Sequence, residues 1–460
     1  MRHPLRFHPK ATLQWNTSDF DETVTRRHPA SVLLPSPAVN DAPTSAPALD
    51  PQLLQKLSKD PAKRIDEVIA FYRRERRPVE LFEAMKMKSR MRFGLPMIAP
   101  PDEKLGMQTP REAEIQRGLE EGLLDACRQA GAMLIEDGKI GEGWMYLRPI
   151  GDPALAKRLF STVEITEDNY DEMIHVLLHE GVDLERGFNA VLQQQGTCNS
   201  ITLYDSTISS RSREDKKIAA KCLLIHLFDE LDERVREDFA QRASDNGIDP
   251  DAIQRDRDNA VLGELVTKHK WILGGGGYHL DTTHLASVVR FAQVLDDPGL
   301  LEKALQLCQY GRQLPPDFQY PGEEPFVDFY PAHAAFFSAL LGKNVDTAVR
   351  LFGQRARTVD SIVHGSGAIE TYIELLDRLG RPGEALRAAM ELFPDEVPLG
   401  RVMPEMIEMA GRASQKGDDK IVAQLEKFCF DRGDLLGVAA AGELLSPKPR
   451  QTTRMTAGQS

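Results

Sequence analysis

Three side chains that could bind a metal ion or move a proton lie within six residues of one another. They are His279, Asp281 and His284, which follow Tyr278 and a run of four glycines. Histidine and carboxylate groups are common ligands of divalent metals, and a histidine oriented by a carboxylate is a general base. Asp281 is also well placed to cap a helix predicted over 282–294, by accepting a hydrogen bond from the backbone N–H of His284 or its neighbour. Capping is the favoured interpretation, and a polar small-molecule pocket and a metal site are the alternatives.

The four glycines, 274–277, do not form a nucleotide-binding loop. The letters GGGGYH match neither GxGxxG nor GxxxxGK[ST], and no alternation of strands and helices surrounds them. Four glycines most simply let the backbone pass close to a neighbour or reverse direction. We therefore predict no cofactor and no bound metal. An enzyme is the alternative function, with Tyr278–His284 lining a pocket and Arg290 binding an anion there.

A second group of ionisable residues is better explained by packing than by metal binding. Glu172, His175 and His179 share one face of a helix predicted over 169–180. A metalloprotease motif needs glutamate directly after its first histidine, and Val176 stands at that position. A di-iron site would need a second Glu-x-x-His, which the chain lacks. We expect these histidines at the edge of the core or in solvent.

Helices are expected to position all of these residues, because apolar residues recur at helical spacing from residue 50 onward. Helices are predicted over 112–135, 141–147, 215–228 and 230–243, among others. Two long segments interrupt the pattern. The segment 196–212 is rich in Ser, Thr and β-branched residues, and 310–329 holds four prolines. We interpret both as ordered loops, which tend to be functional inside compact helical folds.

The longer irregular segments of a helical array tend to lie on one face. We therefore predict that Thr197–Asn199, Tyr278–His284 and Phe318–Phe329 surround a single depression. This adds Thr197 and Asn199 to the binding candidates, which already include Tyr278, His279, Asp281, His284 and Arg290.

One pattern recurs along the chain: a helix, a short turn with Gly or Asp, and a second helix with a small residue about five positions on. Copies surround Gly138, Gly299, Gly342, Gly380 and Gly433. Glycine takes the left-handed conformation that ends the first helix, and the small residue lets two helices approach closely. Each hairpin has more apolar surface than it can bury alone, so neighbouring pairs must stack.

The copies in 332–394 resemble the tetratricopeptide repeat family. In Ile369–Pro394, Gly380, Ala385 and the closing Pro394 stand near the family's positions, although its paired aromatics are mostly replaced and the intervals between glycines are not regular. The resemblance implies a helical solenoid and, by analogy, partner binding. Unrelated antiparallel helix pairs that share this turn chemistry are the alternative.

Composition argues for a folded protein without general affinity for nucleic acid or membranes. The 460 residues carry a net charge of −13, which repels polyanions. Residues 73–92 are an exception, with eight Lys or Arg against three Glu. We expect these charges to pair with acidic neighbours in the fold, and a docking patch for an acidic partner is the alternative. The five scattered cysteines, among them Cys198, are expected to be reduced, inert thiols.

These observations predict an all-α protein, a superhelical array of antiparallel helix pairs (an α-solenoid similar to tetratricopeptide repeats). The predicted parts are a disordered tail at 1–49, helical arrays at 50–266 and 267–445, and a second tail at 446–460. The predicted function is a non-catalytic scaffold that binds a protein or peptide. No secretory signal or span of about 20 apolar residues is present, so the cytoplasm is the expected location.

Overall fold

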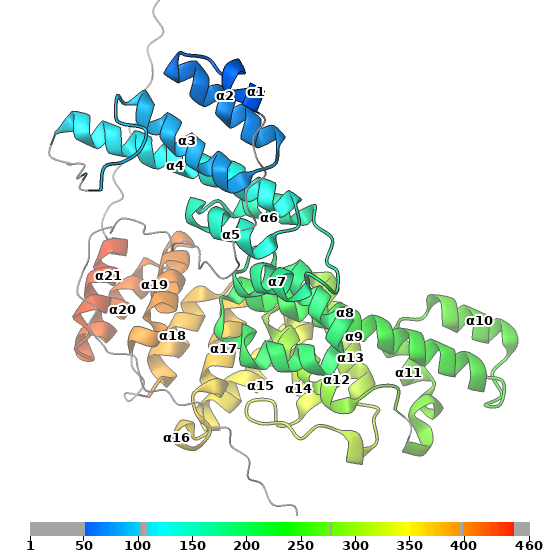
Figure 1. Cartoon of the computed structure of the whole chain (residues 1–460). Coiled ribbons are helices and arrows are strands. Elements are labelled where there is room, and N and C mark those ends of the chain that lie inside the picture. Colours follow the sequence, from blue (N-terminus) through cyan, green and yellow to red (C-terminus); the bar gives the residue numbers. More distant parts are fainter. Residues whose placement is uncertain (1–50, 102, 104–108, 277, 395–398, 446–460) are drawn as a thin grey trace, which may run out of the picture. The chain divides into compact units, whose positions relative to one another are not determined.

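The computed structural model describes residues 51–101, 103, 109–276, 278–394 and 399–445. Every regular element in this part of the chain is a helix, and none of it is strand (Figure 1). The all-α prediction is therefore confirmed. The predicted disordered tails, 1–49 and 446–460, lie outside the described residues, and the first helix begins at Pro51.

The chain divides into two compact units, Met1–Arg64 and Ile65–Ser460. The described part of the first unit holds α1 (Pro51–Lys56) and the start of α2 (Pro61–Arg74). Asp60 begins α2 by accepting a hydrogen bond from the backbone N–H of Ala62 at 3.1 Å.

The second unit begins with the rest of α2 and four further α-helices, the longest of which is α4. These are α3 (Pro78–Arg92), α4 (Pro110–Glu136), α5 (Ile140–Leu147) and α6 (Pro153–Ser161). α4 begins with a capping box, in which Thr109 accepts from the N–H of Glu112 and the Glu112 carboxylate accepts from the N–H of Thr109. Both α3 and α5 pack along α4. The helices predicted over 112–135 and 141–147 are confirmed.

The basic segment 73–92 is largely neutralised by neighbouring carboxylates. Arg76 bonds Asp137 at 2.6 Å and Glu136 at 3.1 Å, and Arg90 bonds Glu103 at 2.7 Å. The bonds to Asp137 and Glu136 raise the pKa of the Arg76 guanidinium above its usual value. The bond to Glu103 does the same for the pKa of Arg90. The pairing interpretation is confirmed, and this segment gives no support to the docking-patch alternative.

The middle of the chain contains two long helices that differ from the predicted boundaries. Its helices are α7 (Tyr170–Ile174), continued by a π-helical turn (His175–His179), α8 (Leu184–Ser206), α9 (Arg213–Arg242), α10 (Pro250–Asn259) and α11 (Leu262–Lys268). The two helices predicted over 215–228 and 230–243 are one continuous helix, α9, because neither Gly nor Pro interrupts it.

The segment 196–212 is mostly helical, so its interpretation as a loop was wrong. α8 kinks at Gly196, whose φ of 77° and ψ of 177° lie outside the helical region, and the chain then resumes a helix as far as Ser206. The polar side chains that suggested a loop satisfy the helix's own carbonyls. Asn199 donates to the Gln195 carbonyl, Ser200 to that of Gly196, and Thr202 to that of Cys198.

The C-terminal part is a succession of packed helices. They are α12 (Thr282–Phe291), α13 (Pro298–Gly311), α14 (Phe329–Leu340), α15 (Val345–Thr358), α16 (Ser361–His364), α17 (Gly367–Arg378), α18 (Pro382–Leu392), α19 (Leu399–Gln415), α20 (Asp419–Asp431) and α21 (Leu435–Leu445). Gly342, Gly380 and Gly433 end helices with positive φ, as predicted. Gly299 does not, because it lies in the first turn of α13, which Asp297 caps.

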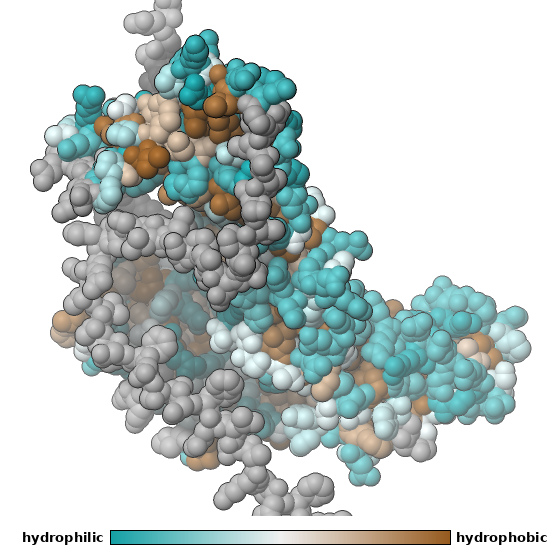
Figure 2. All heavy atoms as spheres, in the orientation of Figure 1, coloured by the Kyte–Doolittle hydropathy of each residue, from teal (hydrophilic) through white to brown (hydrophobic). Residues whose placement is uncertain are grey.

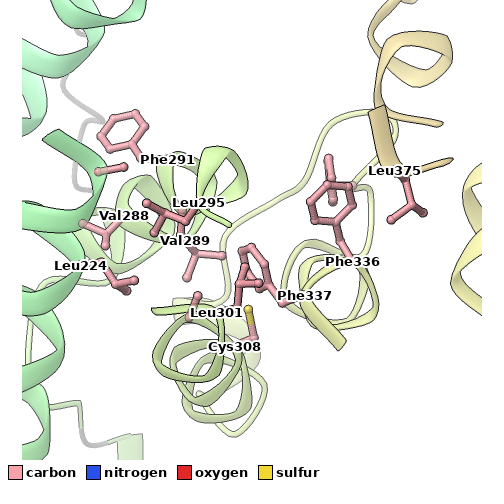
Figure 3. Packing of buried hydrophobic residues seen from close by; sticks show 14 of the residues in the cluster. Leu224, Val288, Val289, Phe291, Leu295, Leu301, Cys308, Phe336, Phe337 and Leu375 are labelled. Carbon is pink, nitrogen blue, oxygen red and sulfur yellow. The ribbon is translucent and has the colours of Figure 1, made fainter. Parts of the chain in front are cut away.

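A large hydrophobic core joins the middle and C-terminal helices. Its members range from Ile174 to Ala441. Figure 3 shows Leu224 of α9 facing Val288 of α12, and Phe337 of α14 beside Cys308 of α13. Residues on both sides of the predicted division at 266/267 contribute to this core, and the division itself stays a prediction. None of the described helices has the length and apolar character needed to cross a membrane.

Candidate functional site

His279 lies just after the glycine-rich segment and is held by two helices. Its Nε2 lies 3.1 Å from an Asp238 carboxylate oxygen of α9, and its Nδ1 lies 3.0 Å from the Tyr310 hydroxyl of α13. The Tyr310 oxygen also accepts from the backbone N–H of His279 at 3.0 Å. This geometry fits the tautomer in which Nε2–H donates to Asp238 and Nδ1 accepts the Tyr310 O–H. With only 10% of its side chain exposed, His279 anchors the segment rather than presenting a free imidazole.

The glycine-rich segment is fastened to α9 on both sides of the glycines. A 3₁₀ helix covers Lys270–Gly276, and Gly277 lies outside the described residues. Arg242 of α9 donates to the Ile272 carbonyl at 2.7 Å, and Arg234 donates to the His279 carbonyl at 2.9 Å. Burial acts to raise the pKa of Asp238, but bonds from Arg242 and His279 outweigh it and hold the pKa below its usual range.

Asp281 caps α12, so the favoured interpretation of this residue is confirmed. One carboxylate oxygen accepts from the backbone N–H groups of Thr283 at 2.8 Å and His284 at 3.3 Å, and from the Thr283 hydroxyl at 2.6 Å. The Thr283 hydroxyl bond is the main reason that the pKa of Asp281 is lowered. His284 donates to the cap through its backbone N–H, and its side chain contributes an electrostatic effect on Asp281. The described contacts therefore do not bring His279, Asp281 and His284 together around a common point.

The remaining predicted residues lie before α12, at its far end, and on α8. Before the helix, exposed Tyr278 packs on Phe318, with ring centroids 4.9 Å apart. At its far end, Arg290 bonds Asp205 of α8 at 3.0 Å. Thr197 and Asn199 lie on α8 beyond that contact, and no described contact links them to Tyr278 or to the 310–329 segment. Two of the three predicted segments thus meet, and no described contact brings the third, Thr197–Asn199, to them.

A cleft between α17 and α19 is a better candidate site, and the sequence did not indicate it. Its volume is about 750 Å³. Both helices pack on α18, and the cleft lies between their facing sides. Its apolar lining residues, which are buried, form the bottom, and they are Ile373, Phe393, Val402, Met406 and Met409. Its charged lining residues are Arg213, Lys216, Asp296, Glu370, Glu374, Asp377, Arg378, Arg401, Glu405, Glu408 and Arg412.

Most charges of this α17–α19 cleft already have partners. Arg213 of α9 lies 3.1 Å from Glu374, and Arg412 lies 2.7 Å from Asp377. Arg378, with 8% of its side chain exposed, pairs with Asp296 at 3.0 Å and Glu374 at 3.2 Å. These pairs join α9, α17 and α19 into the walls of the cleft.

Glu405 is different: it lines the α17–α19 cleft but is exposed to solvent, and its side chain has no ion-pair or hydrogen-bond partner among the described residues. Burial in the cleft raises the pKa of the Glu405 carboxyl, and the neighbouring carboxylates of Glu370, Glu374 and Glu408 raise it further, against the effect of Arg213. Lys216, from α9, is a cation of the lining that likewise has no such partner in the described part of the chain. The lining therefore offers one carboxylate and one ammonium group with which a ligand could form ion pairs.

The sequence could have indicated this cleft only in part. Met406 and Met409 follow Val402 at helical spacing, and Glu405, Glu408 and Arg412 flank them, which is typical of an amphipathic helix. The pattern does not reveal that a second helix with Glu370 and Glu374 faces this one.

Two interior histidines, His333 and His269, have structural roles. His333 is 1% exposed; its Nδ1–H donates to the Phe329 carbonyl at 2.7 Å, and its Nε2 accepts from the Gln293 amide at 2.6 Å. Burial lowers the pKa of His333 to about 4, so the ring is neutral. It lies on the buried face of α14.

His269 fastens a polar helix to the rest of the fold. Its Nε2 lies 2.8 Å from the Asp256 carboxylate of α10, which also accepts from Lys268 at 2.6 Å. Bonds from Lys268 and His269 hold the pKa of Asp256 below its usual range. Hydrophilic residues dominate the visible surface of α10 in Figure 2, which is consistent with attachment through an ionic contact.

The Glu172 group is used structurally. Glu172 accepts from the backbone N–H of Gly141 at the start of α5, at 3.0 Å. His175 lies 3.7 Å from Glu180, and burial, with Arg211 and His175 nearby, lowers the pKa of His179. No cluster of three or more His, Cys, Asp or Glu suited to a metal ion occurs within the described ranges.

Comparisons of the chain with protein-family models, with curated proteins and with solved structures find no match.

Proposed function

We propose that this protein is a helical-repeat scaffold that binds a segment of another polypeptide in the α17–α19 cleft. The cleft is the single observation that carries the proposal. It combines an apolar bottom with a charged lining, which is how grooves that bind peptides are built, with apolar anchors supplying affinity and charges supplying register.

The arrangement of the C-terminal helices supports the proposal. Each helix from α17 to α21 packs on the next one in sequence, and α18 contacts α20 while α19 contacts α21 (Figure 1). Stacked helix pairs of this kind, similar to tetratricopeptide repeats, form long surfaces along which an extended or helical segment can lie. We propose the solenoid arrangement for this part of the chain on the same grounds.

An enzymatic function has no comparable support. The residues suggested for it, Tyr278 to His284, are engaged in a helix cap and in anchoring bonds, and they line none of the cavities described. The cleft contains carboxylates and arginines but no histidine, serine or cysteine to act as base or nucleophile.

The proposal is tested by selecting ligands from a library of short random peptides displayed against the full chain. Glu405→Trp places an indole ring in the cleft and blocks it whatever the charge of the ligand. Glu443→Trp adds the same ring on α21, at an exposed position outside the cleft. Circular dichroism confirms that both variants remain helical.

We expect the selected peptides to bind the wild type and Glu443→Trp alike, and to lose about tenfold or more in affinity on Glu405→Trp, a loss of about 1.4 kcal/mol. A library that yields no enriched peptide, or peptides that bind Glu405→Trp undiminished, would contradict the proposal.

A further inference from the structure

The balance of charge in the α17–α19 cleft indicates which kind of segment it accepts. Four glutamates line it, Glu370 and Glu374 from α17, and Glu405 and Glu408 from α19. Three of them are engaged: Glu374 by Arg213 and Arg378, Glu408 by Arg412, and Glu370 by Arg401 at 3.6 Å.

Glu405 is the carboxylate left over. It stands among the other three glutamates, and no cation within the described residues pairs with it. A carboxylate beside like charges is less favourable in the ionised form, and a cation brought by a ligand relieves that repulsion. The surrounding floor, Met406 and Met409 with Val402 and Ile373, offers only apolar contact.

Resting on the proposed function, we infer that the segment bound in this cleft is a basic, amphipathic peptide that places a Lys or Arg side chain against Glu405 and apolar side chains on the methionine floor. A long basic side chain suits this site, because its methylene groups can lie along the methionines while its charged end reaches the carboxylate. Methionine is also a flexible apolar surface that adapts to different partner side chains.

The opposite polarity is weaker. Lys216 is a cation of the lining without an ion pair among the described residues, and an acidic peptide could use it. Such a peptide would, however, bring its own carboxylate into a cleft whose lining already holds six carboxylates against five cations. The basic peptide is therefore the occupant that the charges favour, and the acidic peptide is an outcome of the test.

The experiment uses the peptides selected on the wild-type chain and compares three glutamine variants, each of which removes one charge. Glu405→Gln removes the charge at the proposed contact, Lys216→Gln removes the cation of the lining that has no ion pair among the described residues, and Glu443→Gln removes a carboxylate on α21 outside the cleft. Binding is measured by isothermal titration calorimetry at low and at high salt.

We expect selected peptides enriched in Lys or Arg next to Leu, Met or Phe. Their affinity should fall about tenfold on Glu405→Gln, stay unchanged on Glu443→Gln and Lys216→Gln, and weaken as salt rises. Glu405→Gln should unfold no more easily than the wild type, because it removes repulsion rather than a bond.

Each alternative result is decisive. Enriched acidic peptides that depend on Lys216 would overturn the inference and leave the proposed function standing, as would basic peptides that bind Glu405→Gln undiminished but lose affinity on Glu405→Trp. A library without any enriched peptide would remove both.

Discussion

Two histidines of the same short segment have opposite surroundings. The His279 side chain bonds both Asp238 and Tyr310, whereas no side-chain contact is described for His284. The sequence analysis treated the pair alike, because spacing reveals that they are neighbours but not what faces them. The partners of His279 stand 41 and 31 residues away, beyond the reach of a local pattern.

We predict that His279→Ala lowers the free energy of unfolding by about 1–3 kcal/mol, because it removes the side-chain bonds that His279 makes to the Asp238 carboxylate and the Tyr310 hydroxyl. His284→Ala, the matched control, should change it by no more than about 0.5 kcal/mol. Urea unfolding followed by circular dichroism measures both. Equal effects of the two substitutions would refute the anchoring role of His279.

His333 should make stability depend on pH in mildly acidic solution. Burial lowers its pKa from 6.5 to about 4, so between these values the unfolded chain takes up a proton that the folded chain refuses. The contribution is fully present above pH 6.5 and is lost as the pH falls towards 4, by about 3 kcal/mol in total. Unfolding of the wild type and of His333→Gln, measured from pH 7 to pH 4, should show a shallower decline for the variant. Parallel curves would contradict this.

At the scale of the helix, local signals were read correctly where the decisive residues are adjacent. The Asp281 cap and the glycine turn at Gly380 involve groups only a few residues apart. The misreading of 196–212 has an equally local cause, since Asn199, Ser200 and Thr202 compete for backbone hydrogen bonds and usually favour turns. Here they bond carbonyls one turn back in a helix. Whether such residues form a turn or a helix is decided by the three-dimensional structure, not by their types.

The kink in α8 depends on glycine at one position. Gly196 has a backbone conformation that side chains with a Cβ strongly disfavour. We predict that Gly196→Ala destabilises the fold by about 1–3 kcal/mol. Gly400→Ala, in the first turn of α19 with open space around it, should instead be neutral or stabilise by up to about 1 kcal/mol. Thermal unfolding of the two variants distinguishes these outcomes, and a stabilising Gly196→Ala would show that the kink is not required.

At the scale of the whole molecule, the sequence indicated helices throughout but not how they share a core. The large core includes Leu224 of α9 together with Val288 of α12 and Leu301 of α13 (Figure 3). Apolar periodicity shows which face of each helix is buried, and it is silent on which helix covers that face. The α17–α19 cleft was missed for the same reason.

This shared core makes the predicted division at 266/267 testable. A fragment ending at residue 266 would expose the face of α9 that packs on α12 and α13, and a fragment beginning at 267 would expose the other side of the contact. We expect each separate fragment to bind a hydrophobic dye and to unfold without a cooperative transition, whereas the whole chain unfolds cooperatively. Two fragments that each melt cooperatively would show that the array does consist of independent halves.

Arg378 gives the protein a narrow tolerance to change at one position. Its guanidinium donates to the carbonyls of Gln293 and Leu295 and also pairs with Glu374 and Asp296. Only a planar group with several fixed donors can serve so many acceptors at once, and a lysine would satisfy one or two of them. Arg401, on the same cleft, is 72% exposed and has a single distant partner. For folding alone, position 401 therefore tolerates substitution, whereas at position 378 even lysine, the chemically closest residue, would leave buried acceptors unpaired.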